Sequence, residues 1–287
     1  MASILVTGSS RGIGRATALT LGRAGHTVHA TMRNPAAATS LAETIAEEGL
    51  AVHLSAMDVT IDSSVADGIA AIEAAHGPLD ALVNNAGIEH HGSIEELPLV
   101  DIRAIMETNY FGALRCIQAV MPSMRARRRG CIVNVTSVAG RISSSPLGAY
   151  AASKFALEAA SEALAQEAAM FGVRVAIVQP GIINTEMAQA ITTEHDTSPY
   201  PHARRFGGLF AASLQHPTSP MLVAETIREI VEGDTGRLRH PVGPDAEPFL
   251  AWRAAMTDEE WVAWGAAQDE EWYASVELDF GLDARRG

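Results

Sequence analysis

Short apolar runs rich in β-branched residues alternate along this chain with longer segments of helical periodicity, and this rhythm constrains the fold most. The runs predict strands at residues 3–6, 27–31, 51–56, 81–83, 131–135 and 173–178. The longer segments predict helices at about 12–25, 36–48, 62–76, 98–127 and 150–171. Such alternation is typical of βαβ units with a buried parallel sheet. We therefore expect an α/β fold, with one Rossmann-type doubly wound parallel sheet, helices on both faces and a C-terminal helical extension.

The rhythm breaks over residues 182–220, where four prolines and Gly207-Gly208 are scattered among apolar residues. A long apolar insertion with such breakers predicts a mobile lid over a binding site. A helix at 221–232 and a last strand at 237–242 should follow. The expected organisation is a nucleotide-binding catalytic domain over 1–243, with its lid at 182–220, and a Trp-rich helical extension over 244–287.

The extension holds all four tryptophans of the chain. Thr257 and Glu260 have the spacing of a capping box, which starts a helix. From there Trp261, Trp264 and Trp272 recur at near-helical spacing, which predicts one amphipathic helix. Its apolar stripe should pack on the same subunit's sheet or lid, or on a neighbouring subunit, and shape the substrate pocket without supplying a catalytic group.

Charge and composition narrow the possible partners. The formal charge of −13 disfavours nucleic acid and anionic membrane surfaces. No apolar run is long enough to span a bilayer, and no secretion signal is apparent. Cys116 and Cys131 have no metal or redox spacing, and His90-His91 lacks further ligands nearby. We expect a cytoplasmic protein that binds no metal, no nucleic acid and no membrane.

The first strand leads into a glycine-rich turn, Thr7-Gly8-Ser9-Ser10-Arg11-Gly12-Ile13-Gly14, and then into a helix. Glycines at such a turn let the backbone approach a pyrophosphate, which the helix amino end also favours. The spacing differs from G-x-G-x-x-G, so a simple tight turn remains an alternative reading of these residues by themselves.

The first 42 residues contain no acidic side chain but four arginines: Arg11, Arg15, Arg23 and Arg33. An NAD site places a carboxylate at the end of the second strand, whereas an NADP site needs arginine for the 2′-phosphate. Met32 and then Arg33 stand at that position, and Arg11 is within reach of the same phosphate. This pattern predicts NADP(H), with Arg15 and Arg23 interpreted as solvated residues.

Tyr150 and Lys154 are four residues apart in a helical segment and should share one face. A phenol has an ordinary pKa of about 10, which a neighbouring cation lowers. Ser137 ends a predicted strand at the sheet edge where ligands bind, and its hydroxyl can hold a substrate oxygen. A Tyr-x-x-x-Lys pair also occurs on ordinary helix surfaces, so the spacing does not decide the function.

Together these motifs resemble the short-chain dehydrogenase/reductase family, in the subfamily marked by Thr-Gly-x-x-x-Gly-x-Gly and Tyr-x-x-x-Lys. The resemblance covers about residues 3–243 and includes Asn84-Asn85-Ala86-Gly87, Asn109 and Pro180-Gly181. It implies that Tyr150 exchanges the substrate proton, that Lys154 binds the nicotinamide ribose and lowers the tyrosine pKa, and that Ser137 steadies the substrate oxygen. Asn109 is implied to hold a water linked to Lys154, although an asparagine at a helix kink is the alternative.

The resemblance also implies a set of cofactor contacts. Asp58 and Val59 should face the adenine, and Thr185 with the backbone near Ile183 should hold the carboxamide. The full set is Gly8, Ser10, Arg11, Gly12, Ile13, Gly14, Arg33, Asp58, Val59, Asn85, Ala86, Gly87, Tyr150, Lys154, Pro180, Gly181, Ile183 and Thr185. The family further suggests a homodimer or homotetramer packed through residues 98–127 and 150–171.

Three functions remain open on the sequence. The first is an NADP(H)-dependent carbonyl reductase or secondary-alcohol dehydrogenase for a hydrophobic ketone or alcohol. The alternative is a catalytically inactive NADP-sensing or interaction protein on the same fold, and an epimerase or dehydratase is a third choice. The presence of Tyr150, Lys154 and Ser137 together favours the enzyme. Ser143-Ser144-Ser145, Met187, Phe206 and Phe210 are expected to line its substrate pocket.

Overall fold

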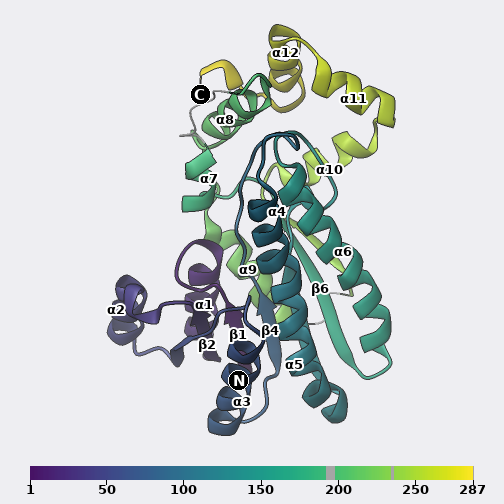
Figure 1. Cartoon of the computed structure of the whole chain (residues 1–287). Coiled ribbons are helices and arrows are strands. Elements are labelled where there is room, and N and C mark those ends of the chain that lie inside the picture. The colour runs from purple at the N-terminus through teal and green to yellow at the C-terminus, as the bar shows by residue number, and fades with distance from the viewer. Residues whose placement is uncertain (192–197, 234–235, 287) are drawn as a thin grey trace.

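A seven-stranded parallel sheet forms the centre of the computed structural model, which describes residues 1–191, 198–233 and 236–286 (Figure 1). The strand order is β3-β2-β1-β4-β5-β6-β7. The strands are β1 Ser3–Thr7, β2 Thr27–Met32, β3 Val52–Ala56, β4 Ala81–Asn84, β5 Gly130–Val135, β6 Val173–Pro180 and β7 Arg239–Val242. The predicted doubly wound α/β fold is therefore confirmed, with strand positions correct to within a few residues.

Helices cover both faces of the sheet and extend beyond one of its ends (Figure 1). None of the described helices is long and apolar enough to cross a membrane. The helices are α1 Gly12–Arg23, α2 Thr39–Glu48, α3 Asp62–His76, α4 Leu99–Met106, α5 Gly112–Arg127, α6 Gly148–Ala169, α7 Glu186–Ile191, α8 His202–Ser213, α9 Pro220–Glu232, α10 Ala246–Ala254, α11 Asp258–Ala266 and α12 Asp269–Phe280.

Each face of the sheet has its own apolar core, because successive side chains of a strand point to opposite faces. On β1, Ile4 and Val6 belong to the core that includes Ile227 of α9. Leu5, which lies between them, belongs to the opposite core with Val120 of α5. Burial on both faces explains why the central strands β1, β4 and β5 consist mostly of apolar residues.

The segment 98–127 is not the single helix that its periodicity predicts. A π-helical turn over Glu107–Phe111 separates α4 from α5. Asn109 lies in this turn, and its amide bonds the backbone of Ile88: Oδ1 accepts from the nitrogen at 2.8 Å and Nδ2 donates to the oxygen at 2.9 Å. A π turn inserts a residue and redirects side chains at a point where a helix meets a site.

The lid segment contains two helices, α7 and α8, while residues 192–197 of the predicted lid lie outside the described residues. The expectation that Gly207-Gly208 breaks the helical structure is wrong, because both glycines lie inside α8. A Cβ on Gly208 would lie 2.0 Å from the backbone oxygen of Ala284. The glycine thus permits close packing against the end of the chain instead of breaking the helix.

The C-terminal extension packs on the lid of its own chain. The predicted capping box is confirmed, since Thr257 and Glu260 bond each other's backbone nitrogens at the start of α11. The prediction of one helix through Trp272 is wrong, because α11 ends at Ala266 and α12 starts at Asp269. In Figure 1, α8, α11 and α12 gather at the end of the molecule opposite α2 and α3.

The break between α11 and α12 has a polar partner from the lid. The guanidinium of Arg205 on α8 donates to the backbone oxygen of Ala267 at 2.8 Å and to Asp269 Oδ1 at 2.8 Å. A carbonyl oxygen at a helix end needs such a donor when water is excluded. Arg205 thus supplies from α8 the donor that the turn between the two helices needs, and three acidic residues in the first turn of α12 mark the start of that helix.

Candidate active site

A cavity of about 660 Å³ opens at the carboxyl ends of the strands, and it is bounded by the glycine-rich loop, the ends of β4, β5 and β6, the lid and the C-terminal extension. The strand order reverses between β1 and β4, so connections leave to opposite faces and form a crevice there. Every residue that the family resemblance implies as a cofactor contact lines this cavity. The sheet thus brings together segments separated by up to about 180 residues of chain.

The glycine-rich loop adopts a shape that requires glycine at three positions. Gly8 and Gly12 have φ angles of +68° and +53°, in the left-handed region that other residues rarely adopt. Gly14 has no such φ, but a Cβ there would lie 2.3 Å from the backbone oxygen of Gly8 and 2.4 Å from Asn85 Nδ2. No side chain caps α1 at its start, where Arg11 is the N-cap residue. The first-turn amides of α1 are therefore available to an anionic group.

Asn85 fastens the glycine-rich loop to the end of β4. Its Nδ2 donates to the backbone oxygens of Thr7 at 2.9 Å and Gly8 at 3.1 Å. The Thr7 hydroxyl in turn accepts hydrogen bonds from the backbone nitrogens of Asn85 and Ala86, both at 3.0 Å. These bonds hold the loop in one position, so the Asn-Asn-Ala-Gly motif has a scaffolding role as well as lining the cavity.

Two of the four early arginines reach the cavity. Arg11 and Arg33 line it together with Met32, and among the described residues neither guanidinium forms an ion pair. Arg23 instead pairs with Glu48 at 2.6 Å, and Arg15 bonds the Thr44 hydroxyl at 3.2 Å. As expected from the sequence, Arg11 and Arg33 line the cavity and Arg15 and Arg23 do not, although Arg23 is ion-paired and not merely solvated.

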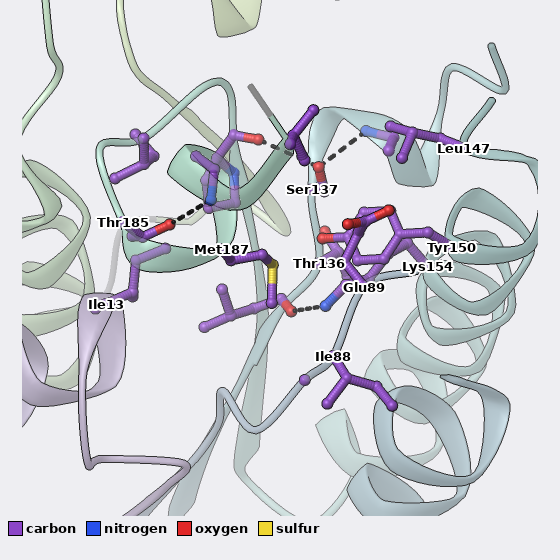
Figure 2. A pocket seen from close by; sticks show the side chains of 18 of the residues that line it. Ile13, Ile88, Glu89, Thr136, Ser137, Leu147, Tyr150, Lys154, Thr185 and Met187 are labelled. Atoms are coloured by element: carbon purple, nitrogen blue, oxygen red, sulfur yellow. Dashed lines mark hydrogen bonds between the residues drawn. The ribbon is translucent and has the colours of Figure 1, made fainter. Parts of the chain in front are cut away.

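Tyr150 and Lys154 lie one helical turn apart near the start of α6, and both face the cavity (Figure 2). Lys154 Nζ donates to the backbone oxygen of Val135 at 2.9 Å and lies 5.6 Å from the centroid of the Tyr150 ring. Ser137 follows β5, and its Oγ accepts from the backbone nitrogen of Ala139 at 3.1 Å. A phenol, an ammonium and a hydroxyl thus share one wall.

Burial shifts the pKa of both titratable groups on this wall. It lowers the pKa of Lys154 to about 8, with Glu158 acting in the opposite direction. Burial also raises the pKa of Tyr150, Glu89 raises it further through its charge, and a hydrogen bond from Ser137 lowers it. Burial, the first of these causes, therefore sets the direction of the Tyr150 shift in this structure.

A buried polar network lies one turn further along α6. Glu158 Oε1 accepts from the Thr136 hydroxyl at 2.8 Å and from Gln179 Nε2 at 3.0 Å. Its other oxygen pairs with Arg239 of β7 at 2.8 Å. The network joins α6 to the ends of β5 and β6, and so it fixes the segment that carries Lys154.

Asn109 does not line the cavity, unlike the other sequence-predicted catalytic residues. Its Nδ2 donates to the Ser153 hydroxyl at 3.0 Å in addition to its bonds with Ile88. Ile88 and Ser153 are neighbours of Glu89 and Lys154 in sequence. The Asn109 side chain therefore positions two walls of the site.

The outer part of the cavity is apolar. The lid supplies Met187, Ile191, Phe206, Leu209 and Phe210. Of these, Met187, Phe206 and Phe210 were expected from the sequence. The extension supplies Phe249, Trp252, Trp261, Trp264, Val276 and Phe280. Of the serine run only Ser144 lines the cavity, and neither histidine of His90-His91 does.

Two acidic residues at the site were not predicted from the sequence. Glu89 lines the cavity beside Tyr150, directly after the Asn-Asn-Ala-Gly turn, where the neighbouring histidine pair drew attention instead. Asp245 Oδ2 accepts from the backbone nitrogen of Ile182 at 2.7 Å, and a Cβ on Gly181 would meet its Oδ1 at 2.2 Å. Asp245 therefore ties the start of the lid to the start of the extension.

A doubly wound sheet with an open glycine-rich loop at its switch point, facing a tyrosine, a lysine and a serine, defines a dinucleotide-dependent oxidoreductase. Residues 2–196 match the family described as short chain dehydrogenase. The chain therefore belongs to the short-chain dehydrogenase family, whose members are oxidoreductases that bind a nicotinamide cofactor.

Individual relatives differ in how much of the chain they cover. A 3-ketodihydrosphingosine reductase from Bacteroides thetaiotaomicron is 40% identical over 182 residues, which is 63% of this chain and 64% of that protein. Retinol dehydrogenase 8 from Bos taurus is 34% identical over 267 residues, covering 88% of this chain and 85% of that protein. A crystal structure of a short-chain dehydrogenase from Streptomyces avermitilis has a TM-score of 0.76 and 34% identity, and the match covers 93% of this chain and 98% of that one.

Proposed function

We propose that this chain is an NADP(H)-dependent carbonyl reductase or secondary-alcohol dehydrogenase that acts on a hydrophobic ketone or alcohol. The observation that carries this proposal is that Tyr150, Ser137 and Lys154 share one cavity with the glycine-rich loop. A protein that only senses the cofactor has no need of all three groups in one place. Their convergence favours the enzyme over the inactive sensor.

The residues present fit a nicotinamide dinucleotide. Gly14 leaves no room for a side chain beside Gly8, and the uncapped start of α1 faces the cavity, as a pyrophosphate requires. Lys154 would hold the nicotinamide ribose, and Thr185 with Ile183 the carboxamide, since all three line the cavity. When bound, the reduced cofactor supplies the hydride that the carbonyl carbon receives.

The protein's own part in the reaction is proton transfer and orientation. In reduction, Tyr150 gives its phenolic proton to the carbonyl oxygen, while the Ser137 hydroxyl holds that oxygen by a hydrogen bond. The raised pKa of Tyr150 keeps the phenol protonated, as a general acid must be. In alcohol oxidation the same phenol oxygen must accept the proton, which requires the phenolate.

The choice of NADP(H) over NAD(H) rests on Arg11 and Arg33. Both line the cavity at the end where the adenosine half would lie, and Met32 occupies the place of an NAD-selecting carboxylate. A 2′-phosphate carries negative charge that a guanidinium binds through charge-assisted hydrogen bonds. Arginines without an acidic partner in the described structure are suited to that task.

The hydrophobic character of the substrate rests on the outer wall of the cavity, where the lid and the extension contribute aromatic and aliphatic side chains. Two similar proteins have names that denote a retinol and a 3-ketodihydrosphingosine activity.

We propose residues 1–243 as the catalytic unit, with 182–220 as its lid, and residues 244–287 as an extension that completes the substrate wall. A cytoplasmic location and a small-molecule partner belong to the same proposal.

The test is NADPH consumption by the purified full-length chain with a panel of ketones that differ in polarity. Apolar ketones should be reduced with a higher kcat/KM than sugar-like ketones, and NADPH should be preferred to NADH. Tight NADPH binding without turnover of any ketone, and without oxidation of the corresponding alcohols, would favour the sensor and overturn the enzyme.

A further inference from the structure

Asp245 places a carboxylate directly behind the stretch of backbone that closes one end of the cavity. This stretch, residues 181–183, follows β6 and lines the cavity, whereas Asp245 lies between β7 and α10 and does not line it. Asp245 Oδ2 accepts a hydrogen bond from the backbone nitrogen of Ile182 at 2.7 Å. Neither the proposed cofactor contacts nor the proposed proton transfer uses this residue.

Two glycines allow the carboxylate to approach the backbone so closely. A Cβ on Gly181 would lie 2.2 Å from Asp245 Oδ1, and a Cβ on Gly243 would lie 2.8 Å from the same atom. Carbon and oxygen atoms that are not bonded do not come this close, so a side chain at either position would displace the carboxylate. Gly181 itself lines the cavity, and it has no side chain that could separate the carboxylate from it.

The negative charge of Asp245 has no compensating cation in the described part of the chain. Burial raises the pKa of this carboxyl, and hydrogen bonds from the backbone nitrogens of Ile182 and of Asp245 itself lower it, with no contribution from a charged side chain. Its Oδ1 is buried and, among the described residues, meets no hydrogen-bond donor. A charge in such surroundings is weakly screened, so it makes the potential in the adjoining part of the cavity more negative.

The adjoining part of the cavity is the nicotinamide end of the proposed cofactor site. Ile183 belongs to the same stretch of backbone, and Thr185 follows it; these two residues are the proposed partners of the carboxamide. Figure 2 shows Thr185 on the side of the site opposite Tyr150 and Lys154. The nicotinamide ring carries a positive charge in NADP⁺ and none in NADPH. A fixed negative charge at this end therefore attracts the oxidised form and not the reduced form.

We propose that Asp245 raises the affinity of the site for NADP⁺ relative to NADPH, because it holds a negative charge behind residues 181–183. The inference rests on the cofactor site of the function proposed above. Lys154, on the opposite side of the site, acts in the other direction through its positive charge. The two side chains together set the balance between the two forms of the cofactor, one of which is consumed and the other formed in each turnover.

The experiment compares Asp245→Asn with the natural chain in the binding of NADP⁺ and of NADPH, measured by calorimetric titration near neutral pH without substrate. Asparagine has the size of aspartate and keeps an oxygen that can accept from Ile182, but it carries no charge. We expect the Kd of NADP⁺ to rise about 3- to 10-fold, the scale of attraction between two unit charges separated by several ångströms of protein. The Kd of NADPH should stay within about twofold.

A second variant and two controls locate the effect. Asp245→Ser keeps a smaller, uncharged acceptor and should change the ratio of the two Kd values in the same direction. Asp67→Asn makes the aspartate-to-asparagine change on the exposed surface of α3 and should leave the ratio unchanged. Adenosine 2′,5′-bisphosphate contains the adenosine half of the cofactor without the nicotinamide, so its Kd should be the same in Asp245→Asn and in the natural chain.

Two results would overturn the inference. Equal weakening of NADP⁺ and NADPH in Asp245→Asn would show that Asp245 only holds residues 181–183 in place. Unchanged Kd values for both forms would show that its charge does not act on the cofactor. Binding of both forms without turnover of any ketone would instead overturn the proposed reductase function and leave the inference intact, because the Kd values are measured without substrate.

Discussion

The Nε atom of Arg205 on α8 lies 2.8 Å from Oδ1 of Asp269 at the first residue of α12. The Arg205 side chain is 4% exposed, and the same guanidinium bonds the backbone oxygen of Ala267. One buried cation thus connects the lid to α11 and α12 of the C-terminal extension. Because these elements together form the outer wall of the cavity, the pair links the stability of the chain to the shape of its substrate site.

Replacing Arg205 by methionine should lower the free energy of unfolding by about 2–3 kcal/mol, because it leaves the buried backbone oxygen of Ala267 without its donor and removes the buried partner of Asp269 Oδ1. The loss should be read from urea unfolding followed by tryptophan fluorescence. Arg204 pairs with the same Asp269 at 2.7 Å but is half exposed, and Arg204→Met should cost under about 1 kcal/mol. Equal losses in the two variants would show that burial of Arg205 is unimportant.

Tyr150→Phe should abolish ketone reduction while NADPH still binds, because the change removes the proton donor and leaves the ring in place. Single-turnover NADPH absorbance measures the chemical step, and fluorescence titration measures the cofactor Kd. Phe210→Leu, a change on the apolar lid wall, serves as control and should alter KM more than the proton-transfer step. Substantial turnover by Tyr150→Phe would contradict the assignment of the acid.

The double change Arg11→Gln, Arg33→Gln should weaken NADPH binding by about 3 kcal/mol, or roughly 100-fold, and should leave NADH binding almost unchanged. The reason is that only NADPH carries the 2′-phosphate. Arg15→Gln removes one positive charge from the same region but not from the cavity, and should affect neither cofactor. An equal loss of binding affinity for NADPH and NADH would contradict the assignment of a 2′-phosphate site.

Ketone reduction should decline above about pH 8, because Lys154 has its pKa lowered to about 8 and loses its charge as the pH rises through that value. Tyr150 stays protonated over the same range, since its pKa is raised. Glu158 raises the pKa of Lys154, so Glu158→Gln should move the decline to lower pH. A pH profile of kcat/KM that is identical in the two proteins would exclude Lys154 as its origin.

We expect the chain to form a homodimer or homotetramer through α4, α5 and α6. Val100 on α4 is 68% exposed and Phe111, at the end of the π turn, is 44% exposed, and burial of such side chains favours association. Val100→Asp, Phe111→Asp should lower the mass measured by light scattering, whereas Leu278→Asp on α12 should not. A monomeric mass for the natural chain at micromolar concentration would refute this expectation.

The sheet could be predicted from the sequence because the residues that specify each strand are adjacent in the chain. The central strands are short, mostly apolar runs, and each is followed by a segment of helical periodicity that can cover the sheet. The glycine-rich loop and the Tyr150–Lys154 pair could also be predicted from local information, because a short spacing fixes the relative positions of their residues within one segment. Their convergence on one cavity then follows from the order of the strands.

The features that could not be predicted depend on distant contacts. Gly208 lies inside a helix because the backbone of Ala284 packs against it, and the chain turns after Ala266 because Arg205 from another helix binds there. The contacts of the Asn109 amide with Ile88 and Ser153 likewise join segments far apart in the sequence. Glu89 stands out only once the apolar walls around it are known.

The two ends of the cavity come from different stretches of chain. The glycine-rich loop, Tyr150 and Lys154 lie within the first 154 residues, whereas Trp252, Trp261, Trp264 and Phe280 lie in the last 40. Substitutions in the extension can therefore reshape the substrate wall while the cofactor and proton-transfer groups keep their places. Related chains can therefore diverge by changes in the C-terminal segment. They can acquire different substrates with the same chemistry, without passing through an inactive ancestor.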